Sequence, residues 1–364
     1  MPIQRRLLAA LLLAAPVVMF PSCQQLLLFR SAGPPISIGF PATAEGGGCN
    51  FGSISIGFPL AAPFRELGLA TVRVPAGSSK GAALLPSGSQ AVHGQPGSPA
   101  YGRIVSLLRS AGCVFAEDEA RLLLAETCSP TELQRNVRRR MEGVPLEHIL
   151  GWAEFAGGRV LVEPGVFVPR RRTELLVAEA LALLRNDALA APPVVVDLCC
   201  GSGAVGVAVL RQAPRVDLHA ADIEPTAVRC AHANLEPLGG HVHAGDLFEA
   251  LPPALHGRVR VLTVNAPYVP TEAIRTMPPE ARLYEPAVSL DGGPDGLDFH
   301  RRIAVGGTQW LASEGHLLIE TSERQAAGTS EILAAAGFAV RRVRSEELDG
   351  TVVIGRLVAE SARR

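Results

Sequence analysis

A short polar tetrapeptide, Asn265-Ala266-Pro267-Tyr268, follows an apolar run at residues 259–264 that is typical of a buried β-strand. The asparagine carboxamide oxygen and a neighbouring backbone carbonyl offer two hydrogen-bond acceptors, and the tyrosine ring offers a flat face. Such a set suits a planar NH2 group, which has two hydrogens to donate. The tetrapeptide therefore indicates chemistry on an amide or amino nitrogen, although taken alone it also fits a plain turn after a strand.

A glycine-rich turn lies upstream of the tetrapeptide. Val194-Val195-Val196-Asp197-Leu198 runs into Cys199-Cys200-Gly201-Ser202-Gly203, in the order strand, turn, helix. Residues 201–206 match the G-x-G-x-x-G dinucleotide fingerprint, and Asp222 follows the next predicted strand at residues 216–221. A nicotinamide cofactor is disfavoured because Asp197 stands just before the turn and the polar tetrapeptide ends the fourth strand.

The order of these features resembles class I methyltransferases that use S-adenosylmethionine. Asp197 and the turn are followed by Asp222, then by Asp246 after a short strand at residues 241–244, then by the tetrapeptide. Each acid alone has a plain explanation as a helix cap or turn residue, but their joint order favours a ligand site at the carboxyl ends of parallel strands. The resemblance implies that the glycines approach the methionine end of the cofactor, that Asp222 accepts the ribose hydroxyls, and that Asp246 and Leu247 border the adenine. The cofactor-binding residues expected on this basis are Asp197, Cys199, Cys200, Gly201, Ser202, Gly203, Asp222, Ile223, Asp246, Leu247 and Asn265.

Further motifs resemble the protein-(glutamine-N5) methyltransferases, which methylate the glutamine of class I peptide chain release factors, with a sister branch acting on a ribosomal protein. The resemblance runs from about residue 101 to the C-terminus. It is carried by residues 143–151, 154–155, 166–170, 173–174, 197–203, 265–268 and 290–297. The expected partner is therefore a protein substrate, a release factor or a ribosome-associated protein.

The chain departs from the family pattern at three places. Ala266 replaces the first proline of Asn-Pro-Pro-Tyr, which keeps the carbonyl but removes the ring that restricts the backbone. Cys199 stands where the family tends to have glycine, and Arg171 and Arg172 replace a proline and an acid. These departures favour a divergent branch with NAPY in place of NPPY.

The mechanism implied is an in-line displacement at the sulfonium methyl. A glutamine amide nitrogen is a poor nucleophile, so its orientation should matter more than a strong base. The Asn265 oxygen and the Ala266 carbonyl are expected to accept the two amide hydrogens, and Tyr268 to pack against the amide or the methyl. The catalytic residues expected are Asn265, Ala266, Pro267 and Tyr268, and the substrate-binding residues are Pro169, Arg170, Asn265 and Tyr268.

The predicted fold is α/β, a Rossmann-like class I methyltransferase domain with a seven-stranded, mostly parallel sheet, preceded by a small helical domain. Apolar residues at helical spacing predict helices within residues 101–142, which the resemblance makes a substrate-docking domain. Residues 143–169 are expected to form a hinge and hairpin, and residues 170–364 the catalytic domain. Strands are also predicted at residues 316–319 and 351–357.

The first hundred residues are rich in glycine, proline and serine, and are expected to be disordered or a spurious extension of the reading frame. Residues 5–23 imitate a secretory signal, and their apolar part is too short to span a bilayer. A genuine signal is the alternative. We expect a cytoplasmic protein without a membrane segment, because the cofactor and substrate implied are cytosolic.

Charge and residue spacing weigh against other functions. The net charge of −1 gives no basic footprint for nucleic acid, although residues 170–172 keep open an adenine-amino methyltransferase acting on nucleic acid. A non-catalytic cofactor-binding protein is the third hypothesis, with Cys199 and Ala266 marking decay of the site. No metal is expected, because Cys199 and Cys200 are adjacent and the pair His241 and His243 has no partners at ligand spacing in the sequence.

Overall fold

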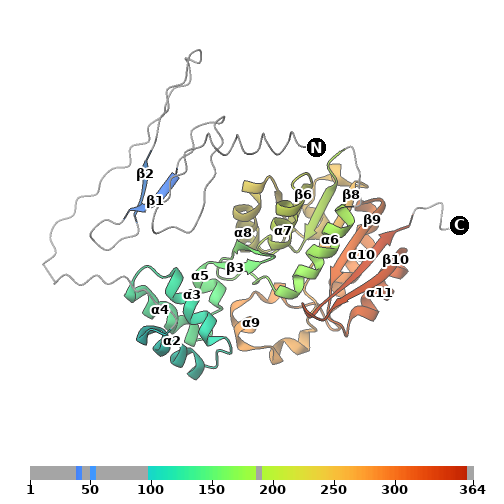
Figure 1. Cartoon of the computed structure of the whole chain (residues 1–364). Coiled ribbons are helices and arrows are strands. Elements are labelled where there is room, and N and C mark those ends of the chain that lie inside the picture. The colour runs from blue at the N-terminus through green and yellow to red at the C-terminus, as the bar shows by residue number, and fades with distance from the viewer. Residues whose placement is uncertain (1–37, 43–49, 55–96, 186–190, 359–364) are drawn as a thin grey trace, which may run out of the picture. The chain divides into compact units, whose positions relative to one another are not determined.

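The computed structural model describes residues 38–42, 50–54, 97–185 and 191–358 (Figure 1). The chain divides into two compact units, Met1–Gln90 and Ala91–Arg364. In the first unit, β1 (Ile38–Ala42) and β2 (Asn50–Ile54) pair in antiparallel fashion. The signal-like residues 5–23 lie outside the described residues. Among the described helices, none is both long enough and apolar enough to cross a membrane.

Four helices precede the sheet in the second unit. They are α2 (Pro99–Ser110), α3 (Ala116–Glu126), α4 (Pro130–Met141) and α5 (Leu146–Leu150). Ser98 and Ser129 begin α2 and α4 by accepting hydrogen bonds from backbone N–H groups in the first turn. The apolar faces meet in a small core of their own, which includes Leu108, Leu123 and Val137. The helical spacing in the sequence predicted helices within residues 101–142, where α3, α4 and most of α2 lie, whereas α5 falls in the segment predicted as a hinge and hairpin.

A seven-stranded sheet forms the centre of the second unit, with strand order β10-β11-β9-β8-β5-β6-β7. The five strands from β7 to β9 are parallel to one another, and β11 runs antiparallel to both β9 and β10. The strands are β5 (Val194–Leu198), β6 (Asp217–Asp222), β7 (His241–Ala244), β8 (Val259–Val264), β9 (Leu311–Glu320), β10 (Phe338–Ser345) and β11 (Gly350–Leu357). The predicted α/β fold with a seven-stranded, mostly parallel sheet is confirmed, whereas a separate helical domain before it stays a prediction. All residues of β5 are buried, as its run of valines predicts for a central parallel strand.

Helices cover both faces of this sheet (Figure 1). One face packs against α6 (Glu174–Arg185), α7 (Ala204–Gln212) and α8 (Pro225–Leu235). The other packs against α10 (Asp298–Trp310) and α11 (Ala326–Ala335). The chain goes from β5 to β6 and β7 on one side and to β8 and β9 on the other, so the strand order reverses at β5. A crevice at the carboxyl ends of β5 and β8 is where such sheets bind ligands.

Short elements connect these parts. The hairpin of β3 (Trp152–Phe155) and β4 (Gly158–Leu161) lies within the predicted hinge region. The single-turn elements are η1 (Arg171–Thr173), η2 (Glu236–Leu238), η3 (Leu247–Ala250), η4 (Pro253–Leu255), η5 (Thr271–Thr276) and η6 (Ala287–Ser289), and α9 (Pro279–Tyr284) is a short helix. The sequence analysis did not anticipate β10, whose exposed arginines suit an edge strand and conceal its apolar alternation.

Candidate active site

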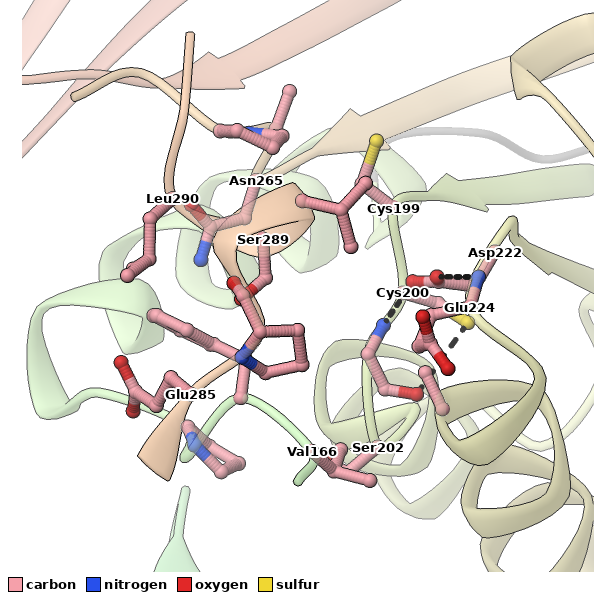
Figure 2. A pocket seen from close by; sticks show the side chains of 18 of the residues that line it. Val166, Cys199, Cys200, Ser202, Asp222, Glu224, Asn265, Glu285, Ser289 and Leu290 are labelled. Carbon is pink, nitrogen blue, oxygen red and sulfur yellow. Dashed lines mark hydrogen bonds between the residues drawn. The ribbon is translucent and has the colours of Figure 1, made fainter. Parts of the chain in front are cut away.

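A cavity of about 540 Å³ lies at the carboxyl ends of β5, β6 and β8, at the point where the strand order reverses (Figure 2). Residues from both predicted sets line it together: Pro169, Arg170, Asp197, Cys199, Cys200, Gly201, Ser202, Asp222, Ile223, Asp246, Leu247, Asn265, Ala266, Pro267 and Tyr268. Figure 2 shows Asn265, Ser289 and Glu285 on one side and Asp222 and Glu224 on the other. The two sets therefore face one another across the cavity.

The turn after β5 needs unusual backbone geometry. Cys199, Gly201 and Gly203 have φ angles of 56°, 56° and 77°. Gly203 does not line the cavity, and a Cβ there would lie 2.9 Å from a methyl of Leu235. Gly203 thus allows the turn to pack closely on α8. Cys199 adopts the left-handed conformation despite its side chain, at a cost on the order of 1 kcal/mol.

Asp197 is a buried acid in the cavity lining. Its Oδ1 accepts a hydrogen bond of 3.0 Å from the Thr263 hydroxyl, while its buried Oδ2 has no hydrogen-bond partner among the described residues. Burial is the main reason that the pKa of this carboxyl is raised to about 7. An acceptor oxygen without a partner at a cavity wall is suited to a ligand that brings a donor, above all a cationic one.

Asp222 lies at the end of β6, across the crevice from the tetrapeptide. Its two carboxylate oxygens accept the backbone N–H groups of Gly201 (2.8 Å) and Glu224 (2.9 Å). These bonds hold the carboxylate against the turn, and each oxygen keeps a lone pair for another donor. Asp246 is held by an ion pair of 2.6 Å with Arg302 on α10.

Thr173, which belongs to one of the family-like motifs, and Glu320, which the sequence analysis did not single out, hold the tetrapeptide. The Asn265 Nδ2 donates to the Thr173 hydroxyl at 3.4 Å, and Thr173 in turn hydrogen-bonds to the buried Glu320. The Tyr268 hydroxyl donates to Glu320 Oε1 at 3.5 Å. Thr173 thus engages the NH2 end of the Asn265 carboxamide, which leaves the oxygen end to accept a bond from a ligand. Burial raises the pKa of Tyr268 to about 12, so the phenol stays neutral.

The glycine-rich segment at residues 290–297 supports the backbone of the tetrapeptide. A Cβ on Gly292 would lie 2.7 Å from the Pro267 carbonyl oxygen, and one on Gly296 would clash with the Tyr268 carbonyl. The Gln325 side chain donates to that same Tyr268 carbonyl at 2.9 Å. Only glycine permits this close approach, which is the physical reason for the motif.

Glu285 is a further residue that sequence reasoning missed. Its side chain is 1% exposed and forms an ion pair with Arg170, and its Oε1 also accepts the Val168 N–H. Within the part of the chain that the structure describes, its buried Oε2 has no hydrogen-bond partner, and burial raises the pKa of the Glu285 carboxyl. The only local signal is its position between an aromatic residue and Pro286, which by itself predicts a turn.

Known proteins share these features. The profile of the family described as "Methyltransferase small domain" matches residues 158–277. A "Release factor glutamine methyltransferase" of Geobacter sulfurreducens is 37% identical over 204 residues, which cover 56% of this chain and 69% of that relative. The chain belongs to the protein-(glutamine-N5) methyltransferase family.

Two further proteins are similar to this chain. A "4-amino-L-phenylalanine/4-methylamino-L-phenylalanine methyltransferase" of Streptomyces pristinaespiralis is 33% identical over 61% of this chain and 81% of that relative. Among solved structures, a release factor-specific protein-(glutamine-N5) methyltransferase of Alicyclobacillus acidocaldarius is 22% identical with a TM-score of 0.33, covering 53% of this chain and 95% of that one. The matches include both protein and small-molecule methyltransferases.

Proposed function

We propose that this methyltransferase transfers a methyl group from S-adenosylmethionine to the side-chain amide of a glutamine in a protein, a release factor or a ribosome-associated protein. The observation that carries the proposal is the meeting of two residue sets at the strand reversal. Leu198 and Val264 are register partners, so the cofactor turn and the tetrapeptide leave β5 and β8 side by side. The names of several relatives support a glutamine acceptor.

The residues present fit the cofactor. Asp197 Oδ2 would accept from the ammonium of its methionine part, and the N-terminus of α7, whose Ala204 and Val205 line the cavity, suits the carboxylate. Asp222 would accept from the ribose hydroxyls, and Ile223, Asp246 and Leu247 would border the adenine. When bound, S-adenosylmethionine supplies a methyl group activated by a sulfonium sulfur.

The tetrapeptide would orient the acceptor nitrogen. The Asn265 carboxamide oxygen and the Ala266 carbonyl would accept the two amide N–H groups, which directs the nitrogen lone pair toward the donor side of the cavity. During methyl transfer these acceptors would stabilise the positive charge that develops on the nitrogen, and one N–H proton would then pass to water. The neutral Tyr268 would provide an apolar face beside the amide. Helices α2 to α5 would dock the substrate protein.

A small aromatic amine is a second candidate acceptor, favoured by the similarity to the aminophenylalanine methyltransferase. An aryl NH2 group presents the same planar geometry and two hydrogens. A protein would reach the cavity through one inserted side chain, whereas the free amine would need to be enclosed within it.

The test is methyl transfer by the purified full chain. Methyl-labelled S-adenosylmethionine would be offered with release factors, ribosomal proteins, 4-amino-L-phenylalanine or DNA, and the product mapped by mass spectrometry. We expect label on a protein glutamine, and a loss of roughly 10²–10³-fold in kcat for Asn265→Ala with cofactor binding retained. Gln212→Ala, an exposed amide on α7, is the matched control. Label only on the free amine or only on adenine would refute the glutamine acceptor, and cofactor binding without transfer to any acceptor would favour a non-catalytic protein.

A further inference from the structure

A second group of polar side chains lies on β6 and β7, outside the active-site cavity. This edge cluster consists of Asp217, His219, His241 and His243. His219 and His241 are register partners on the two parallel strands, and the other two lie two positions along from them. Because residues two apart in a strand share a face, all four side chains stand on one side of the sheet. β7 is the last strand of the sheet, so the cluster lies at its edge.

The side chains of Asp217, His219 and His241 place their ligand atoms close enough together to hold a metal ion. Asp217 Oδ1 lies 3.2 Å from His219 Nε2 and 3.8 Å from His241 Nε2, and one ligand atom from each residue falls within 4.8 Å of the others. Four tetrahedral ligands of Zn²⁺ at ~2.0–2.2 Å from the ion are separated by roughly 3.3 Å, so small rotations of the side chains would suffice. Two imidazoles and one carboxylate also leave a fourth position for water.

His243 orients the central ligand. Its Nε2 lies 3.0 Å from His219 Nδ1, and the two rings stack with centroids 5.3 Å apart. With Nδ1 engaged in that hydrogen bond, His219 turns Nε2 toward Asp217 and His241, as metal-bound histidines do. Arg258 is a nearby cation, and its charge opposes the binding of a dication.

We propose that the edge cluster binds one divalent transition-metal ion, of which Zn²⁺ is the natural representative, through Asp217, His219 and His241. Imidazole and carboxylate ligands suit zinc and its neighbours in the first transition row rather than Mg²⁺ or Ca²⁺. The ion would join β6 to the edge strand β7. These strands lead to Asp222 and Asp246 at the cavity, so the ion would stiffen the adenosine side of the active site. The ligands come from two strands, which is why the spacing of His241 and His243 in the sequence did not reveal them.

The test is a zinc titration of the tag-free full chain after treatment with a chelator. Calorimetry, or competition with a chromophoric chelator, gives the stoichiometry and Kd, and Co²⁺ gives visible bands that report tetrahedral geometry. We expect binding that His219→Ala and His241→Ala each weaken by at least about tenfold, and that His243→Ala weakens by about 10–100-fold as a loss of ligand orientation. His256→Ala, an exposed histidine outside the cluster, is the control and should leave Kd unchanged.

Zinc should also raise the melting temperature of the unaltered chain and not that of His241→Ala, while Mg²⁺ raises neither. The His241 side chain is 58% exposed, so its removal should not impair folding even where loss of the buried His219 does. Equal zinc affinity in the unaltered chain and a folded His241→Ala would overturn the proposal, as would no zinc binding below millimolar concentration. Methyl transfer plays no part in these readouts, so they are independent of the function proposed above.

Discussion

The affinity for the cofactor should fall as the pH drops below 7, because the carboxyl of Asp197 must be ionised to accept from the ammonium group. Its pKa in the free chain is raised to about 7 by burial. Below that pH, binding must first remove a proton, and the apparent Kd is multiplied by 1 + 10^(pKa − pH) when the bound form stays ionised. The factor is about 11 at pH 6 and about 1.1 at pH 8, so we expect roughly tenfold weaker binding at pH 6.

Calorimetric titration with S-adenosylhomocysteine measures this effect directly, because that product keeps the same ammonium group. Titrations at pH 6 in two buffers of different ionisation enthalpy should show release of about 0.9 proton per ligand bound, the protonated fraction at that pH. Asp197→Asn has nearly the same shape and should bind weakly, with a Kd that changes little between pH 6 and 8. Asp118→Asn, an exposed acid on α3, should behave as the unaltered chain.

A change of less than twofold in Kd between pH 6 and 8 would refute the reasoning. So would an Asp197→Asn variant that keeps the pH profile of the unaltered chain, because another group would then be titrating.

Other expectations follow from the same contacts. The folded-state pKa of Asp197 lies above its ordinary value of 3.8, so the free energy of unfolding falls as the pH rises from about 4 to about 7 and this buried carboxyl ionises. Asp197→Asn should therefore raise the melting temperature of the cofactor-free chain, and by more at pH 8 than at pH 5. Thr173→Val removes the hydroxyl that holds the Asn265 carboxamide, and it should lower kcat by roughly 10–100-fold at unchanged cofactor Kd. Thr173→Ser keeps a hydroxyl and should retain most activity. Equal rates for the two variants would argue against the orienting role of Thr173. Cys199→Gly relieves a φ of 56° and should raise the free energy of unfolding by up to about 1 kcal/mol in denaturant titration, and a decrease would mean that packing of the thiol outweighs the strain.

The sequence alone determined the central part of the fold. The mainly apolar runs at residues 194–198 and 259–264, which contain Asp197, Arg260 and Thr263, are typical of inner parallel strands buried on both faces, and both form there. The strand predicted at residues 216–221 is found one residue later, as Asp217–Asp222, because an acid at a strand end carries little periodic signal. Parallel strands end at one edge of a sheet, so the turn after Asp197 and the tetrapeptide at Asn265 had to meet once both strands were recognised.

Only the tertiary structure decided which distant side chains support those residues. Thr173 and Glu320 hold Asn265 and Tyr268, and Glu285 pairs with Arg170, across more than a hundred intervening residues in that last case. The edge cluster arises in the same way, because the pairing register of β6 and β7 brings His219 beside His241. Local sequence patterns report the conformation and burial of neighbouring residues. Contacts between side chains of separate elements depend on strand register and helix packing, which form only when the whole chain folds.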